Sequence, residues 1–360
     1  MQGITRPTLL LDEQIARNNI RKMAQKAANN GIPIRPHFKT HVSAEIGEWF
    51  REEGITTCTV ASVEMAVYFQ QAGWKDITIA FPFNRLETPV LNELAANGHI
   101  NVVIEDRDTY DFLARHLIHE VSYYIKVDVG THRTGMPANA DFSDLVETDP
   151  LLHFKGFLAH AGHSYRSRSR AEIEKTYQEV QQSLALLKSR YPAAEISYGD
   201  TPTCSIIEQF ENIDELRAGN FVFYDWMQYV INSCAFEDIA VCMAVPVVAK
   251  HPDRNEIVLH GGAIHFSKDQ VKNEEGKAIF GPLVKLTDSG WELMPENHYL
   301  KRVSQEHGIL HVEEEKLFNE IAVGDVLGII PVHSCLAANL MGRYLTTTGK
   351  EIHHMNWRRV

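Results

Sequence analysis

Short apolar runs alternate with amphipathic stretches over the first two-thirds of the chain, and this alternation limits the possible folds more than any other feature. Eight apolar or β-branched runs are predicted strands: residues 32–36, 56–60, 77–81, 100–104, 123–129, 154–160, 195–198 and 216–221. Between most of them lie segments with helical periodicity: residues 45–52, 64–71, 88–96, 110–119 and 170–190. Such an alternation predicts parallel βαβ units. Eight units fit a closed (β/α)8 barrel, with an open doubly wound sheet as the alternative.

The pattern changes near residue 236. The later runs combine β-like composition with turn residues and little helical periodicity: residues 239–249, 256–259, 283–286, 309–312 and 326–332. They predict a separate, mostly antiparallel β domain. We therefore expect an α/β chain with a barrel over residues 12–235 and a C-terminal β domain over residues 236–360. A run at residues 8–11 precedes the first predicted helix, residues 13–29, and is expected to join the β domain.

Composition excludes several classes of protein. The 360 residues carry a formal net charge of -12, and an acidic surface repels phosphate backbones and anionic lipids. We therefore expect neither nucleic-acid nor membrane-surface binding. The five cysteines are odd in number and lack a paired spacing, which favours a reducing compartment. No apolar run resembles a signal peptide or a membrane span. These features predict a soluble cytoplasmic enzyme.

Polar, glycine-containing segments follow several predicted strands, where the active site of a barrel lies. Lys39 follows the first strand between two histidines, and a lysine there can form a Schiff base with a carbonyl cofactor. A solvated lysine is the alternative. Thr201, Gly219 and Asn220 follow strands seven and eight, a common phosphate position in barrels, although ordinary turn chemistry also explains them.

His333 and Cys335 form a third signal. On a strand, residues two apart face the same side, so the imidazole and the thiol would point together. Nitrogen and thiolate sulfur are the ligands that zinc prefers. With only two ligands visible, the metal would keep open coordination positions, which suits a catalytic site. The alternative is a chance pairing of a histidine with a buried cysteine.

Five motifs occur in the order of a known family: residues 36–41, 127–130 with Arg133, 162–165, 219–220 with 223–225, and 333–335 with 339–340. On these motifs the chain, from about residue 6 to residue 340, resembles the D-serine dehydratase / D-threonine aldolase family. These are fold-type III pyridoxal-phosphate (PLP) enzymes related to alanine racemase. The resemblance implies an N-terminal barrel and a C-terminal β domain, in agreement with the pattern of strands and helices.

The resemblance also implies how PLP is held. Lys39 would form the covalent link to the cofactor. Arg133 would lie near the phenolic oxygen, and Arg217 at the pyridine nitrogen. The phosphate would lie near three residues: Thr201, Gly219 and Asn220.

His333 and Cys335 match the metal ligands of the dehydratase branch. Zinc is the expected metal, with manganese or magnesium as alternatives. His163, Tyr165 and Asp128 are expected to position reacting groups, with hydrogen bonding at the barrel mouth as the alternative for each. Tyr165 is also expected to contact the cofactor. The implied reaction is β-elimination from a D-β-hydroxy amino acid, which gives a keto acid and ammonia. Retro-aldol cleavage to glycine and an aldehyde is the alternative, followed by a racemase or a non-catalytic PLP carrier.

The chain also departs from the family. Val42 stands where another lysine is common, residues 260–262 read His-Gly-Gly where Asp-Ala-Gly is commoner, and Ala338 replaces a hydroxyl residue. These positions leave the exact D-amino acid open. Because fold-type III sites lie between subunits, the resemblance also implies a homodimer with its sites at the subunit interface.

Overall fold

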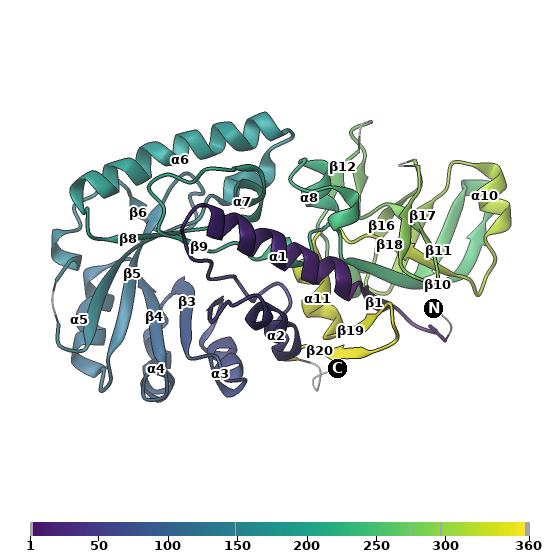
Figure 1. The fold of residues 1–360 in the computed structure, drawn as a ribbon. Coiled ribbons are helices and arrows are strands. Elements are labelled where there is room, and N and C mark those ends of the chain that lie inside the picture. Colours follow the sequence, from purple (N-terminus) through teal and green to yellow (C-terminus); the bar gives the residue numbers. More distant parts are fainter. Residues whose placement is uncertain (1–2, 148, 274, 296, 357–360) are drawn as a thin grey trace. The chain divides into compact units, whose positions relative to one another are not determined.

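The computed structural model describes residues 3–147, 149–273, 275–295 and 297–356, and its described residues divide into two compact units (Figure 1). One unit comprises residues 20–221 and 231–233. The other comprises the described residues of 1–19, 222–230 and 234–360. None of the helices among the described residues combines the length and the apolar character needed to cross a membrane.

The first unit is built on a parallel sheet. Its strands lie in the order β2 (Thr57–Val60), β3 (Asp76–Pro82), β4 (His99–Ile104), β5 (Val121–Asp128), β7 (Leu152–Ala159), β8 (Glu195–Tyr198) and β9 (Glu215–Leu216), and the short β6 (Met136–Pro137) pairs with β5. Isolated parallel bridges join Ile34 to Leu216 of β9 and His37 to Thr59 of β2. Residues 34–37 therefore close the ring between its two edges, and the predicted barrel is confirmed.

Helices lie around the outside of these strands (Figure 1). They are α1 (Glu13–Asn29), α2 (Ala44–Glu52), α3 (Val63–Gln71), α4 (Thr88–Ala95), α5 (Arg107–His116), α6 (Arg170–Arg190) and α7 (Thr201–Ile206). Local capping explains where several begin. The side chains of Ser43, Ser62 and Ser169 each accept a hydrogen bond from a backbone N–H in the first turn of α2, α3 and α6. The bounds of α1 and α6 match the predicted ones.

The second unit contains a ten-stranded, mostly antiparallel sheet, as predicted. Its strands are β1 (Thr8–Leu11), β10 (Val241–His251), β11 (Glu256–His260), β14 (Leu283–Leu286), β15 (Trp291–Leu293), β16 (Tyr299–Val303), β17 (His307–His311), β18 (Val326–Ile329), β19 (Arg343–Thr346) and β20 (Glu351–His353). The long β10 pairs antiparallel with β1, β11 and β18. β1 also pairs with β19, in parallel. A short hairpin, β12 (Val271–Lys272) with β13 (Ala278–Ile279), stands apart from this sheet.

Two predicted strands are wrong at their ends. The run at residues 326–332 ends as β18 at Ile329, and residues 334–341 form the helix α11 (Ser334–Met341) instead of continuing as extended chain. Asp225 explains the change, because its Oδ2 accepts hydrogen bonds from the backbone N–H of Ser334 at 3.0 Å and from its hydroxyl at 3.2 Å. The run at residues 216–221 is a strand only through Leu216, and a 3-10 turn, Asn220–Val222, follows.

Candidate active site

Lys39 lies in a turn directly after the segment that closes the barrel, and its side chain is exposed. The backbone N–H of Lys39 points to Nδ1 of His37 at 3.4 Å. Burial and the charges of Lys39 and Arg217 hold the pKa of His37 well below its usual value. The pKa of His160 is lowered in the same way, by burial and by Lys39. Two imidazoles with lowered pKa values, His37 and His160, therefore lie near Lys39.

Gly219 packs against the backbone just before Lys39. A β-carbon on Gly219 would lie 2.5 Å from the carbonyl oxygen of His37 and 2.8 Å from its Cβ, distances that no side chain tolerates. Only glycine permits this approach of the chain after β9 to the first strand. The close contact sets Gly219 and the neighbouring Asn220, which is 5% exposed, next to the turn that carries Lys39.

Arg217 is held by the two strands before it. Its Nη2 donates to the carbonyl oxygen of Ala159 on β7 at 2.7 Å, and its Nε donates to the hydroxyl of Ser197 on β8 at 3.0 Å. Burial lowers the pKa of Arg217 to about 10, so the guanidinium stays charged at neutral pH. The result is a fixed cation at the ends of β7 and β8.

The start of α7 is organised by the buried Asp200. Its carboxylate accepts hydrogen bonds from the hydroxyls of Ser164 and Tyr198, both at 2.7 Å, and from the N–H of Thr203 at 2.8 Å. Burial raises the pKa of Asp200. The N–H of the next residue, Thr201, points to the hydroxyl of Tyr165 at 3.3 Å. This network ties the loop after β7 to the helix after β8.

Thr201 supplies the observation that points most directly to a ligand. Its side chain is fully buried, and its hydroxyl has no hydrogen-bond partner among the residues that the structure describes. Buried polar atoms are normally paired, so this hydroxyl is set up for a group from outside the chain. An anion such as a phosphate would satisfy it. The residues therefore fit the phosphate end of PLP.

The loops after β5 and β7 are joined to each other. The hydroxyl of Thr131 donates to the carbonyl oxygen of His160 at 2.7 Å and accepts from the N–H of Gly162 at 2.8 Å. The ring of His163 lies so close to Gly130 that a β-carbon there would be 3.0 Å from it. His163 and Tyr165 are both half-buried at this barrel mouth.

Arg133 belongs to the same loop and is exposed. It contributes with Arg217 to the positive surroundings of Lys126, a lysine inside the barrel that the sequence reasoning missed. Burial, followed by the charge of Arg217, lowers the pKa of Lys126 to about 7. Its Nζ donates to the carbonyl oxygens of Val127 and Leu158 at 2.9 and 3.3 Å. A lysine within an apolar strand carries no local signal that its amine faces a polar interior.

The ten sequence-predicted site residues thus fall into two groups. Eight belong to the barrel unit: Lys39, Arg133, His163, Tyr165, Thr201, Arg217, Gly219 and Asn220. The other two, His333 and Cys335, belong to the second unit.

His333 and Cys335 are neighbours, but not through strand geometry. His333 is the N-cap of α11, and Cys335 lies in its first turn. Nδ1 of His333 lies 2.6 Å from Oδ2 of Asp269, a residue that sequence reasoning missed because it is 64 positions away. Burial lowers the pKa of His333, but its interactions with Asp269 and Cys335 outweigh burial and raise the pKa to about 11. An imidazole, a thiol and an orienting carboxylate suit a divalent metal such as zinc.

Comparison with known proteins agrees with both units. The family model for the alanine racemase N-terminal domain matches residues 11–225, and the model described as "Putative serine dehydratase domain" matches residues 240–347. The chain belongs to the D-serine dehydratase / D-threonine aldolase family. It is therefore a lyase of the alanine racemase-like fold.

Individual members of this family are similar over almost their whole length. A D-serine dehydratase from Dictyostelium discoideum is 28% identical, over 96% of this chain and 93% of that protein. A D-threonine aldolase from Arthrobacter is 26% identical, over 91% of this chain and 85% of that protein. A solved structure of a D-threo-3-hydroxyaspartate dehydratase, a cysteine-to-alanine variant in the metal-free form, has a TM-score of 0.89 at 23% identity and covers 98% of both chains.

Proposed function

We propose that this family member is a PLP- and metal-dependent lyase that eliminates the β-hydroxyl of a D-β-hydroxy amino acid, giving a keto acid and ammonia. The observation that carries the proposal is the position of Lys39 directly after the segment that closes the barrel, where Gly219 packs against His37, together with the unpartnered Thr201 hydroxyl in the same unit. A lysine for a covalent cofactor link, groups for a phosphate and a fixed cation would then serve one site.

The residues that would hold PLP follow from this arrangement. Lys39 would form the covalent link, and the phosphate would take hydrogen bonds from Thr201 and from the backbone at Gly219 and Asn220. Arg217 would face the pyridine nitrogen, and the exposed Arg133 would approach the phenolic oxygen, with Tyr165 alongside. Bound PLP supplies an electron sink for the negative charge that develops at the substrate Cα.

Side chains of the protein would transfer the proton and orient the substrate. Nζ of Lys39 would take the α-proton of the substrate as a general base. His37 and His160 stay neutral because of burial and the charges around them, so they add no further positive charge next to this amine. His163 and Tyr165 orient the substrate at the mouth of the barrel.

The hydroxyl leaving group needs help, since hydroxide is a poor leaving group at neutral pH. His333 and Cys335 would hold a divalent metal, and zinc suits their nitrogen and sulfur atoms best. Such a metal acts as a Lewis acid toward a hydroxyl oxygen. The metal-free form of the similar D-threo-3-hydroxyaspartate dehydratase, a cysteine-to-alanine variant, supports a metal that depends on a cysteine.

Retro-aldol cleavage is the second candidate, because the similar Arthrobacter protein is a D-threonine aldolase. Its products are glycine and an aldehyde. We favour elimination because the Dictyostelium relative and the structural neighbour are both dehydratases. The cysteine at position 335 also matches the metal ligand that the resemblance implies for the dehydratase branch.

Product identification tests the reaction. The purified chain, loaded with PLP and zinc, is incubated with D-serine, D-threonine and D-threo-3-hydroxyaspartate. We expect a keto acid and ammonia in equal amounts from at least one of them. Glycine and an aldehyde without ammonia would overturn elimination in favour of aldol cleavage.

A substitution tests the assignment of the lysine. Lys39→Ala should lose the visible absorbance of covalently bound PLP together with all turnover. Lys175→Ala, which changes an exposed lysine on α6, serves as the matched control and should retain both. Retention of the cofactor band in Lys39→Ala contradicts the assignment.

We also propose a homodimer with sites at the subunit interface, an arrangement suggested by the family resemblance. Light scattering of the PLP-loaded chain should give twice the mass of one chain. A monomer that is fully active would contradict the proposal.

A further inference from the structure

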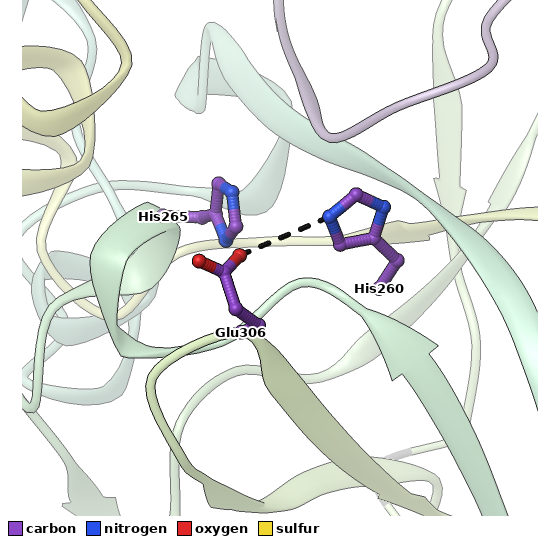
Figure 2. Close-up of side chains that lie close together, drawn as sticks. All are labelled: His260, His265 and Glu306. Carbon is purple, nitrogen blue, oxygen red and sulfur yellow. Dashed lines mark ion pairs between the residues drawn. The ribbon is translucent and has the colours of Figure 1, made fainter.

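A second group of metal-binding side chains lies in the β-domain unit, separate in sequence from His333 and Cys335. Figure 2 shows His260, His265 and Glu306 gathered around a common point. One ligand atom from each lies within 4.8 Å of the other two. Nε2 of His260 is 3.9 Å from Oε2 of Glu306. None of these residues has a part in the proposed elimination.

Three elements bring the side chains together. His260 is the last residue of β11, His265 lies in the short helix α9 (Ala263–Phe266), and Glu306 lies in the turn between β16 and β17. Backbone hydrogen bonds fix this turn against the chain that links β11 to α9. The N–H of Gly261 donates to the carbonyl oxygen of Glu306 at 2.9 Å, and the N–H of Ala263 donates to that of Ser304 at 2.7 Å.

Gly262 makes this approach possible. A β-carbon at Gly262 would lie 2.4 Å from the carbonyl oxygen of Ser304 and 2.5 Å from that of Gln305. Any other residue would push the turn away and carry Glu306 with it. The sequence His260-Gly261-Gly262, a departure from the commoner Asp-Ala-Gly, therefore provides both a ligand and the close packing that brings the other two within reach.

A metal on His265 would replace the hydrogen bond that its ring now accepts. The N–H of Gly262 donates to its Nδ1 at 3.1 Å, so Nδ1 presents a lone pair and the ring proton is on Nε2. A neutral imidazole is the form that binds metals. A metal at Nδ1 would compete with this amide.

The distances between the three ligand atoms are somewhat longer than in a metal-bound site, so these atoms would move closer together when an ion binds. Ligand atoms around tetrahedral zinc lie about 3.4 Å apart, because each bond is about 2.1 Å long. His260 and Glu306 are 42% and 47% exposed, so both can rotate by the small amount that is needed. Their exposure also leaves a coordination position for water.

We propose that His260, His265 and Glu306 form a second metal site, which binds a divalent transition metal such as Zn²⁺ with water completing the coordination. The ligand set, two imidazoles and one carboxylate, is typical of such metals. A metal there would hold the β11–α9 link to the β16–β17 turn. One of its ligands, His265, lies four residues before Asp269 in the chain. The site is independent of PLP and of the reaction on the D-amino acid.

Zinc binding to the full chain tests this site. The background variant His333→Ala/Cys335→Ser removes the other candidate metal pair, and equilibrium dialysis with Zn²⁺ alone as the probe then counts the metal that remains. We expect one zinc per chain. Loss of an orienting neighbour alone weakens metal sites about 10- to 100-fold, so His265→Asn or Glu306→Gln in this background should weaken binding at least about tenfold.

A matched control and a stability measurement separate ligand loss from misfolding. His307 is exposed and lies opposite His260 in the β11–β17 ladder, so His307→Asn in the same background should bind zinc as the background does. Zinc should raise the thermal midpoint of the background and of His307→Asn, but not of His265→Asn. A background that binds no zinc, or a His265→Asn variant that binds it equally well, overturns the proposal.

Discussion

Oδ2 of Asp269 lies 2.6 Å from Nδ1 of His333, and this contact orients the imidazole whose other nitrogen is the candidate metal ligand. A carboxylate in this position fixes the ring and increases the basicity of the coordinating nitrogen. In the metal-free chain it also helps to raise the pKa of His333 to about 11 against the opposing effect of burial.

Asp269→Asn should weaken zinc binding about 10- to 100-fold, because the amide holds the ring less firmly and cannot supply negative charge. The measurement is a zinc competition titration in the His265→Asn background, so that one candidate site is followed. Asp253→Asn, which changes an exposed carboxylate next to Arg254, is the control and should leave the affinity unchanged. Equal affinities in both variants would show that Asp269 does not act on the metal.

Gly219→Ala should destabilise the barrel and empty the cofactor site together. The new methyl group would lie 2.5 Å from the carbonyl oxygen of His37, and such overpacking costs about 1–3 kcal/mol. Urea unfolding gives the free energy, and absorbance gives the PLP content. Gly324→Ala is the comparison, because its β-carbon meets nothing within 4 Å and only backbone strain of about 1 kcal/mol arises. PLP content should fall in the first variant alone.

Lys126→Met should change how stability depends on pH. The pKa of Lys126 is about 7 in the folded chain, lowered by burial and Arg217, against an ordinary value of 10.5. Between these values the unfolded chain holds more protons, so the stability of the natural chain rises as pH increases from about 7 to 10.5. The stability that Lys126 contributes is fully present above 10.5 and is lost as pH falls through 7.

The methionine variant lacks this dependence. Its stability relative to the natural chain should therefore decrease by on the order of 4 kcal/mol across that window. Urea unfolding at several pH values measures the difference, and Lys175→Met on the surface of α6 should show no such trend. A constant difference between Lys126→Met and the natural chain would falsify the pKa assignment.

Arg35→Met should unfold the chain at a markedly lower denaturant concentration. Arg35 is 4% exposed, and its Nε lies 2.6 Å from Glu215 Oε2 while its Nη1 lies 2.5 Å from Asp76 Oδ1. Removal of the cation leaves a buried carboxylate without its partner, at a cost of about 3–5 kcal/mol. Arg170→Met breaks an exposed pair with Glu174 and should change stability by less than about 1 kcal/mol.

The elements that could be predicted from the sequence are those set by neighbouring residues. Ser169 caps α6 by accepting a hydrogen bond from the backbone N–H three residues later in the chain. The strands β4 and β5 are likewise marked by their own apolar runs. Contacts across long separations were not predictable. The start of α11 depends on Asp225, 109 positions before Ser334, and a run of β-like residues before it suggested a strand.

The same distinction holds for the candidate site. Lys39, Thr201 and Gly219 follow predicted strands, so the barrel prediction alone groups them. Asp269 meets His333, and His260 meets Glu306, only through the folding of the β domain. No local sequence pattern specifies these two contacts. The roles assigned to these residues in cofactor and metal binding stay predictions.

The first predicted strand of the barrel pairs with its neighbours only through isolated bridges. One bridge joins Ile34 to Leu216, and the other joins His37 to Thr59. Every other neighbouring pair of strands in the ring shares a ladder. The ring is thus least regular at the segment just before Lys39, and opening this seam would move the lysine away from Arg217. With PLP bound at Lys39 as proposed, its absorbance would report whether this seam of the barrel is closed.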